Sequence, residues 1–254
     1  MLVKLLKYEI KATGRVFLPL YLGLIAAAFL ASFALVSSFD IFNVIAMFLL
    51  FALYVAVVIV TVVLLVQRFY QNLLKEEGYL MFTLPVSPSS LILSKLITTC
   101  MWCFASVGAG AAAALIASRN VFSFGEVINF FTKALAGEPY ASHLTPVLWL
   151  AAIAGISQLV FTIIQVYFSL AVGQLPPFGR HKILFAILVY LATSAAVQTI
   201  AMSLGAIVMR LYPMPEMMSI INGVLLGATA FNLIFAAAMF AGTAWILKKK
   251  LNLE

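Results

Sequence analysis

Few residues in this chain have the type and spacing needed for chemistry. Cys100 and Cys103 form a Cys-x-x-Cys pair, which is the spacing of redox centres and of half a zinc site. The pair lies inside an apolar stretch with no second pair nearby, so we interpret both cysteines as small buried helix residues. The histidines, His143 and His181, form no His-Glu-x-x-His motif of a zinc protease. We therefore expect no catalytic residue, no metal site and no cofactor.

The sequence also lacks the loop that binds nucleotide phosphates. No Gly-x-x-x-x-Gly-Lys-Ser/Thr string occurs, so we do not expect the chain to bind ATP itself. Any hydrolysis of ATP would take place on a partner subunit. The chain is accordingly predicted not to be an enzyme.

The composition is that of a membrane protein. Hydrophobic residues make up 65% of the sequence and charged residues only 9%, against about 25% charged in an ordinary soluble domain. The mean hydropathy is +1.16. The net charge of +7 comes from basic residues at the ends of apolar runs, which indicates orientation in a lipid membrane rather than binding of nucleic acid.

Six apolar stretches are long enough to span a membrane, which takes about 20 residues in a helix. We predict an all-α integral membrane protein with a single transmembrane domain over residues 1–254. The predicted spans are 16–37, 42–66, 91–117, 146–172, 183–208 and 218–247. Only Lys95 brings a full charge into these spans, and we expect its side chain to reach back to the interface.

The basic residues also predict the orientation of the spans. Of the 15 lysines and arginines, only Arg119, Lys133 and Arg210 fall on one side of the predicted membrane; the other twelve fall on the opposite side. Because cytoplasmic loops are rich in lysine and arginine, we place both ends of the chain in the cytoplasm.

Polar side chains inside the spans must face protein or water rather than lipid. They could line a transport pathway or form hydrogen bonds between helices, and either role is open for each residue. The candidates for lining a pathway are Gln158, Gln165, Gln198, Asn222 and Asn232.

Residues 1–15 form a basic, amphipathic segment before the first span. On a helix, Lys4, Lys7 and Lys11 share one face, which favours a helix lying in the membrane interface with its lysines toward anionic headgroups. The alternative is a basic flank that only sets topology. Glu9 falls on the apolar face and therefore needs a partner or access to water.

The predicted outer loop, 118–145, is too long for a simple turn. Ser123 and Glu126 have the spacing of a capping box, and the apolar residues that follow predict a short amphipathic helix. This helix could cover a pathway, or it could be a structural connector.

The cytoplasmic stretch 68–88 contains an apolar core, Gly78–Leu84, that is too short to cross the membrane. Glu76 and Glu77 precede it, and Pro85 and Pro88 follow it. A short apolar element outside the bilayer usually packs on a partner protein. It could instead fold back on its own helix ends.

Two strings resemble bacterial ABC-2-type ABC transporter permeases: Leu5-Leu6-Lys7-Tyr8-Glu9-Ile10-Lys11 and Glu77-Gly78-Tyr79-Leu80-Met81-Phe82-Thr83-Leu84-Pro85-Val86-Ser87. The resemblance extends over the whole chain as six spans with an amino-terminal interfacial helix. The chain departs from better-known members in its short loop at 209–217 and its long loop at 118–145.

The resemblance implies a coupling helix that docks on a separate ATP-binding-cassette ATPase. Its residues here would be Glu76, Glu77, Gly78, Tyr79, Leu80, Met81, Phe82 and Leu84. It further implies an exporter in the bacterial plasma membrane, working with a second copy of the chain or a similar permease. The alternatives are a secondary carrier, which should carry ionisable residues inside the membrane, and a non-transporting sensor or anchor.

The predicted topology can be tested by labelling single cysteines in a cysteine-free chain. Glu126→Cys and Glu138→Cys should react with a membrane-impermeant thiol reagent in intact cells, because both lie on the side poor in basic residues. Lys75→Cys and Lys249→Cys should react only after the membrane is permeabilised. Labelling of Lys75→Cys from outside would overturn the six-span arrangement.

Overall fold

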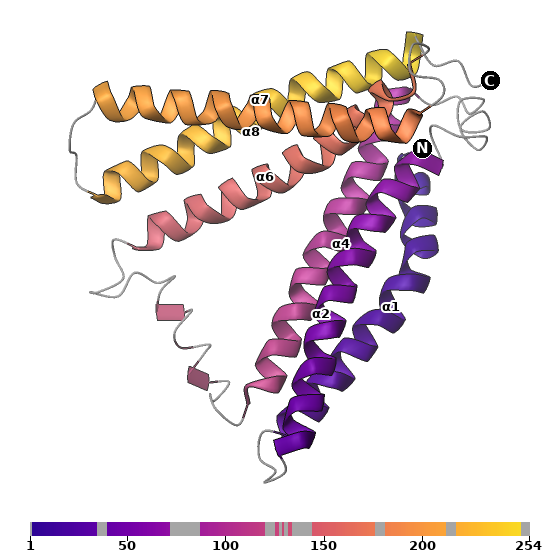
Figure 1. The fold of residues 1–254 in the computed structure, drawn as a ribbon, viewed down its shortest axis with the longest axis vertical. Helices are drawn as coiled ribbons and strands as arrows, with labels where there is room; N and C mark the ends of the chain where they lie inside the picture. The colour runs from indigo at the N-terminus through magenta and orange to yellow at the C-terminus, as the bar shows by residue number, and fades with distance from the viewer. Residues whose placement is uncertain are drawn as a thin grey trace. The chain divides into compact units, whose positions relative to one another are not determined.

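The computed structural model describes residues 2–34, 40–71, 87–119, 125–126, 129, 132–133, 144–175, 181–211 and 217–249. Its elements are six long helices, α1 (Leu2–Ala34), α2 (Asp40–Phe69), α4 (Pro88–Ala117), α6 (Leu144–Val172), α7 (Lys182–Leu211) and α8 (Met217–Lys249) (Figure 1). All six are long and apolar enough to cross a membrane. Over the described residues, the prediction of an all-helical chain with six helices able to span a membrane is thus confirmed.

The hydrocarbon of a lipid membrane explains why these sequences are helical. α2 is rich in valine and isoleucine, which have low helix propensity in water. In hydrocarbon, every backbone amide and carbonyl must be paired within the segment, and a helix achieves this.

α4 begins three residues before the predicted span, and local chemistry explains the difference. The Ser90 amide donates hydrogen bonds to the Ser87 carbonyl at 3.0 Å and to the Ser87 hydroxyl at 3.4 Å. Pro88 follows at the first helical position, where its missing amide hydrogen costs no hydrogen bond.

The first helix is also longer than the predicted span. α1 runs without a break from Leu2 to Ala34, a length of about 50 Å at 1.5 Å per residue. Residues 2–15, predicted as an interfacial helix, are therefore the first turns of this same helix. Lys7 and Lys11 are exposed on it, and Lys4 lies on it with its side chain outside the described part.

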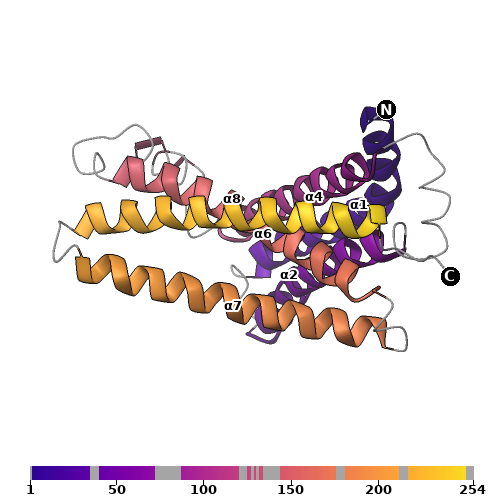
Figure 2. The same cartoon turned by 90° about the horizontal axis from the view of Figure 1, so that it is seen from above.

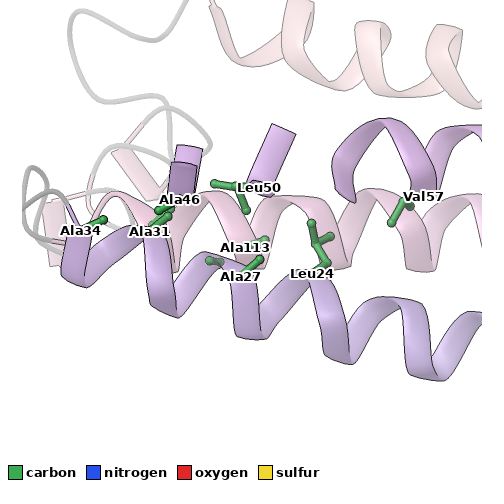
Figure 3. Packing of buried hydrophobic residues seen from close by; sticks show 10 residues of the cluster. Leu24, Ala27, Ala31, Ala34, Ala46, Leu50, Val57 and Ala113 are labelled. Carbon is green, nitrogen blue, oxygen red and sulfur yellow. The ribbon is translucent and has the colours of Figure 1, made fainter. Parts of the chain in front are cut away.

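The chain divides into two compact units. The first comprises residues 1–68 and 93–132 and is built on α1, α2 and α4. Its core is an alanine-rich cluster in which Leu24, Ala27 and Ala31 of α1 face Ala46 and Leu50 of α2, with Ala113 of α4 beside them (Figure 3). Small side chains allow close approach of helix backbones, which is how helices associate in lipid.

The second unit comprises residues 69–92 and 133–254 and is built on α6, α7 and α8. α6 contacts both other helices, α8 more extensively than α7 (Figures 1 and 2). Gly173, just after α6, allows the start of α7 to lie close to the end of α6. A Cβ atom at position 173 would lie 2.6 Å from the Lys182 carbonyl oxygen, which is too close for any other residue type. Phe69 stacks on Tyr167 in this unit, with ring centroids 4.0 Å apart.

Of the outer loop 118–145, the structure describes residues 125, 126, 129, 132 and 133 between Arg119 and Leu144, and each of these is helical. Ser123 and the apolar positions of the predicted amphipathic helix lie outside the described residues.

Candidate functional site

The predicted coupling residues, Glu76 to Leu84, lie outside the described part of the chain. The structure does describe the helices on either side of them. α2 ends at Phe69 and α4 begins at Pro88. The candidate site is a cluster of charged and polar side chains close to these two helix ends, all of it within the first unit.

A carboxylate and two cations form the centre of the cluster. Glu9 of α1 is 8% exposed and Lys95 of α4 is 3% exposed. The Lys95 ammonium donates a hydrogen bond to Oε1 of Glu9. Oε2 of Glu9 lies 3.9 Å from Nη1 of Arg68, whose side chain is 29% exposed. Each oxygen of the carboxylate therefore interacts with a cation from a different helix.

An indole and a threonine extend the contact between α1 and α4 by one helical turn. The Trp102 indole N–H donates to the Thr13 hydroxyl at 2.7 Å, and this hydroxyl donates to the Glu9 carbonyl oxygen at 2.7 Å. Trp102 also stacks on Phe17, with ring centroids 4.5 Å apart. The buried indole, hydroxyl and carboxylate are thus all paired, and α1 and α4 are held together over two successive turns.

A small cavity adjoins the ion pair. Its volume is about 20 Å³, which is room for about one water molecule. It is lined by Glu9, Thr13, Phe17, Thr61, Leu64, Arg68, Lys95, Thr98, Thr99 and Trp102. The cavity is too small for a substrate, so the cluster is more suited to holding helices or moving a proton than to binding a solute.

Energetics explain why the three charges occur together. A lone charge facing lipid is costly, and an ion pair reduces this cost when its geometry is good. Removing one partner from such a pair costs about 3–5 kcal/mol, because the other charge is left buried and unpaired. Arg68 is partly exposed, so its contact with Glu9 contributes less.

The cluster confirms one expectation and corrects another. The sequence predicts that Glu9 needs a partner, and it has two. The prediction that Lys95 extends back to the membrane interface is wrong, because its side chain is buried against Glu9. The physical reason is that a buried carboxylate one helix away offers the ammonium a stronger interaction than the interface does. The sequence does offer a signal for this pair: Glu9 falls on an apolar helix face and Lys95 inside an apolar run, and their charges are opposite.

The polar residues of the second unit mostly join helices. The Gln165 amide of α6 donates to Thr193 at 3.1 Å and to Ser194 at 2.8 Å, both on α7. The Asn232 amide of α8 donates to the side-chain oxygen Oε1 of Gln158 at 2.9 Å and to the Ser157 hydroxyl at 3.4 Å, both on α6. Gln165 and Asn232 are buried. For these residues the structure supports hydrogen bonding between helices.

Gln198 and Asn222 differ from this group. Gln198 is exposed on α7 and makes no hydrogen bond with the residues that the structure describes. Asn222 is half-buried on α8. Its Oδ1 atom is fully buried and has no hydrogen-bond partner among the residues that the structure describes. Gln158 is exposed as well, but its side chain is hydrogen-bonded to Asn232. Among the five candidates, Gln198 is therefore the exposed side chain that makes no hydrogen bond within the described residues.

The first unit contains a second set of polar contacts farther along its helices. The hydroxyl of Tyr21 lies 2.7 Å from that of Ser106, which lies 3.1 Å from that of Thr61. These three residues belong to α1, α4 and α2. Cys100 and Cys103 are both half-buried free thiols on α4. Over the described ranges, no group of three or more His, Cys, Asp or Glu could hold a metal ion.

Comparison of the chain with family models, with curated proteins and with solved structures found no match. Function is therefore inferred from the residues and their geometry.

The contrast between Gln198 and the buried amides can be tested with a hydrophilic thiol reagent. In a chain lacking Cys100 and Cys103, Gln198→Cys should be modified in membranes, because an exposed amide inside a span must face water or a chain that can separate from it. Gln165→Cys should stay unmodified, because that position is buried between α6 and α7. Modification at 165 and protection at 198 would reverse the assignment.

Proposed function

We propose that the chain is the transmembrane permease subunit of an ATP-driven ABC transporter of the bacterial plasma membrane, working as an exporter. The observation that carries the proposal is the position of the charged cluster. Arg68 and Lys95 lie near the ends of α2 and α4 that flank the 70–87 stretch, and both meet Glu9 of α1. Three of the six helices are thus joined close to the stretch where a coupling segment would act.

In this proposal the coupling segment docks on a separate ATP-binding-cassette ATPase. Leu80, Met81 and Phe82 supply an apolar face for a groove on that partner, and Glu76 and Glu77 add polar contacts at its rim. Hydrolysis of ATP on the partner tilts the helices, so that the pathway opens alternately to either side of the membrane.

The proposal includes a second permease, because two ATPase subunits need two docking segments. This second permease is either another copy of the chain or a similar chain. The exposed polar position at Gln198 is available to it or to the pathway. The twelve basic residues predicted to be cytoplasmic support a location of the docking segment and both chain ends on the side that contains ATP.

A secondary carrier is the second candidate, and the buried ion pair is the observation that favours it. Carriers driven by ion gradients use ionisable residues inside the membrane. Glu9 and Lys95 are ionisable and buried on helices that are able to span a membrane, and a small cavity adjoins them. In a carrier, Glu9 would take up and release a proton in each cycle. In a permease driven by ATP, its role would be structural.

Substitution of the apolar face tests the permease proposal. Phe82→Asp and Leu80→Asp should each weaken binding of the ATPase by about thirtyfold, the loss of about 2 kcal/mol that is typical of an interface anchor. The measurement is co-purification of the ATPase with the tagged chain from membranes. Insertion should be normal, since no span is altered.

Gln71→Asp is the matched control for these variants. It adds the same charge at an exposed position just after α2 and before the predicted docking face, so it should leave ATPase binding within about twofold of the wild type. If Leu80→Asp and Phe82→Asp proteins insert normally and retain wild-type ATPase binding, the coupling assignment is wrong.

A further inference from the structure

The two contacts of the Glu9 carboxylate differ in strength. Glu9 and Lys95 are both buried and directly hydrogen-bonded. Arg68 is 3.9 Å from Glu9, and its side chain is 29% exposed. The guanidinium has five N–H donors, but at this distance it makes a charge contact with Glu9 rather than a short hydrogen bond. The Arg68 contact can therefore be broken at a lower cost than the contact with Lys95.

The surroundings of the two contacts show the same asymmetry. α1 and α4 are joined by the ion pair, by the Trp102–Thr13 hydrogen bond and by the Phe17–Trp102 stack. At this end of the unit, the contact between Arg68 and Glu9 is the ion pair that links α2 to α1. α1 and α4 therefore form a tight pair, and the last turn of α2 is joined to them by a separable electrostatic contact.

We propose that the Glu9 carboxylate is an electrostatic coupling switch, which holds α4 through Lys95 permanently and engages Arg68 of α2 in only one state of the transport cycle. This inference rests on the proposed function, because α2 and α4 flank the predicted coupling segment. A force on that segment reaches both helices. When Arg68 leaves Glu9, the last turn of α2 can move relative to the α1–α4 pair, while the rest of α2 stays packed through Thr61 and the alanine-rich core; when Arg68 returns, the ends of the three helices move together.

The switch assigns different roles to residues of one cluster. Arg68 is a positioning residue that should affect coupling without affecting stability. Glu9 and Lys95 should affect both. A purely structural cluster would not separate these effects, because a loss of coupling would then accompany a loss of stability.

The first test replaces Arg68 alone, in the full chain co-expressed with its ATPase and purified as a complex. Arg68→Gln leaves the buried pair intact, so the Tm of the chain and co-purification of the ATPase should match the wild type. Stimulation of ATP hydrolysis by the permease should fall about tenfold, within the usual range of coupling between sites. Arg15→Gln, at an exposed arginine on α1, is the control and should retain full stimulation.

The second test reverses the charges. Glu9→Lys with Lys95→Glu restores the buried pair in the opposite sense, so the Tm should recover relative to either single variant. The ammonium introduced at position 9 would repel Arg68, and stimulation should remain low. Adding Arg68→Glu to this double variant restores attraction at both contacts and should restore stimulation.

The outcomes separate the switch from the proposed function. If Arg68→Gln retains full stimulation, or if the double reversal restores stimulation together with Tm, the switch is wrong while the permease proposal stands. If the wild-type chain neither co-purifies with an ATPase nor stimulates one, the proposed function fails and the switch fails with it. If the triple variant recovers the Tm but not the stimulation of ATP hydrolysis, the attraction between positions 9 and 68 does not carry the coupling, and the switch is wrong.

Discussion

The first unit depends on a carboxylate that lipid alone could not accommodate. Glu9 lies in a long apolar helix, where an unpaired negative charge would be costly. The Lys95 ammonium on α4 neutralises it, and Arg68 on α2 contacts its second oxygen. Because the buried carboxylate and the buried ammonium need each other, α1 and α4 must meet at this end in one register. The Trp102–Thr13 bond and the Phe17 stack then continue the same register into the apolar part of the unit.

Away from this cluster the packing is of another kind. Alanines of α1, α2 and α4 bring the backbones together over the rest of the first unit (Figure 3), and van der Waals contact between small side chains supplies the attraction. The second unit uses amide side chains instead: Gln165 joins α6 to α7, and Asn232 joins α8 to α6. Burial of apolar area does not drive association between helices in lipid. The ion pair, the small side chains and the amides each supply an attraction between helices that does not depend on it.

The sequence is sufficient to predict the architecture, because six stretches of about 20 or more apolar residues admit few alternatives in a membrane. Helix ends are less predictable: α1 continues through residues 2–15, and α4 starts at Pro88, because local capping and favourable pairing extend helices beyond the apolar core. The ion pair is only half predictable. The sequence indicates that Glu9 needs a partner, but the identity of that partner depends on the register of α1 against α4, which no local pattern encodes.

The roles of the polar residues inside the spans are also not predictable from the sequence alone. A glutamine inside a span can join two helices or face a pathway, and the sequence is the same in both cases. Gln165 differs from Gln198 because it is buried and donates to the hydroxyls of Thr193 and Ser194 on α7, whereas Gln198 is exposed. The coupling role of residues 76–84 remains a prediction from the resemblance and from their position between α2 and α4.

The buried ion pair is the central claim about the structure, and a double-mutant cycle on Glu9 and Lys95 tests it most directly. The quantity to measure is the free energy of unfolding of the purified chain in detergent for the wild type, Glu9→Gln, Lys95→Met and the double variant. Each single change should cost about 3–5 kcal/mol, because it leaves one charge buried and unpaired. The loss of stability in the double variant should be smaller than the sum of the two single losses, by at least about 2 kcal/mol. Two small and additive costs would contradict the pairing.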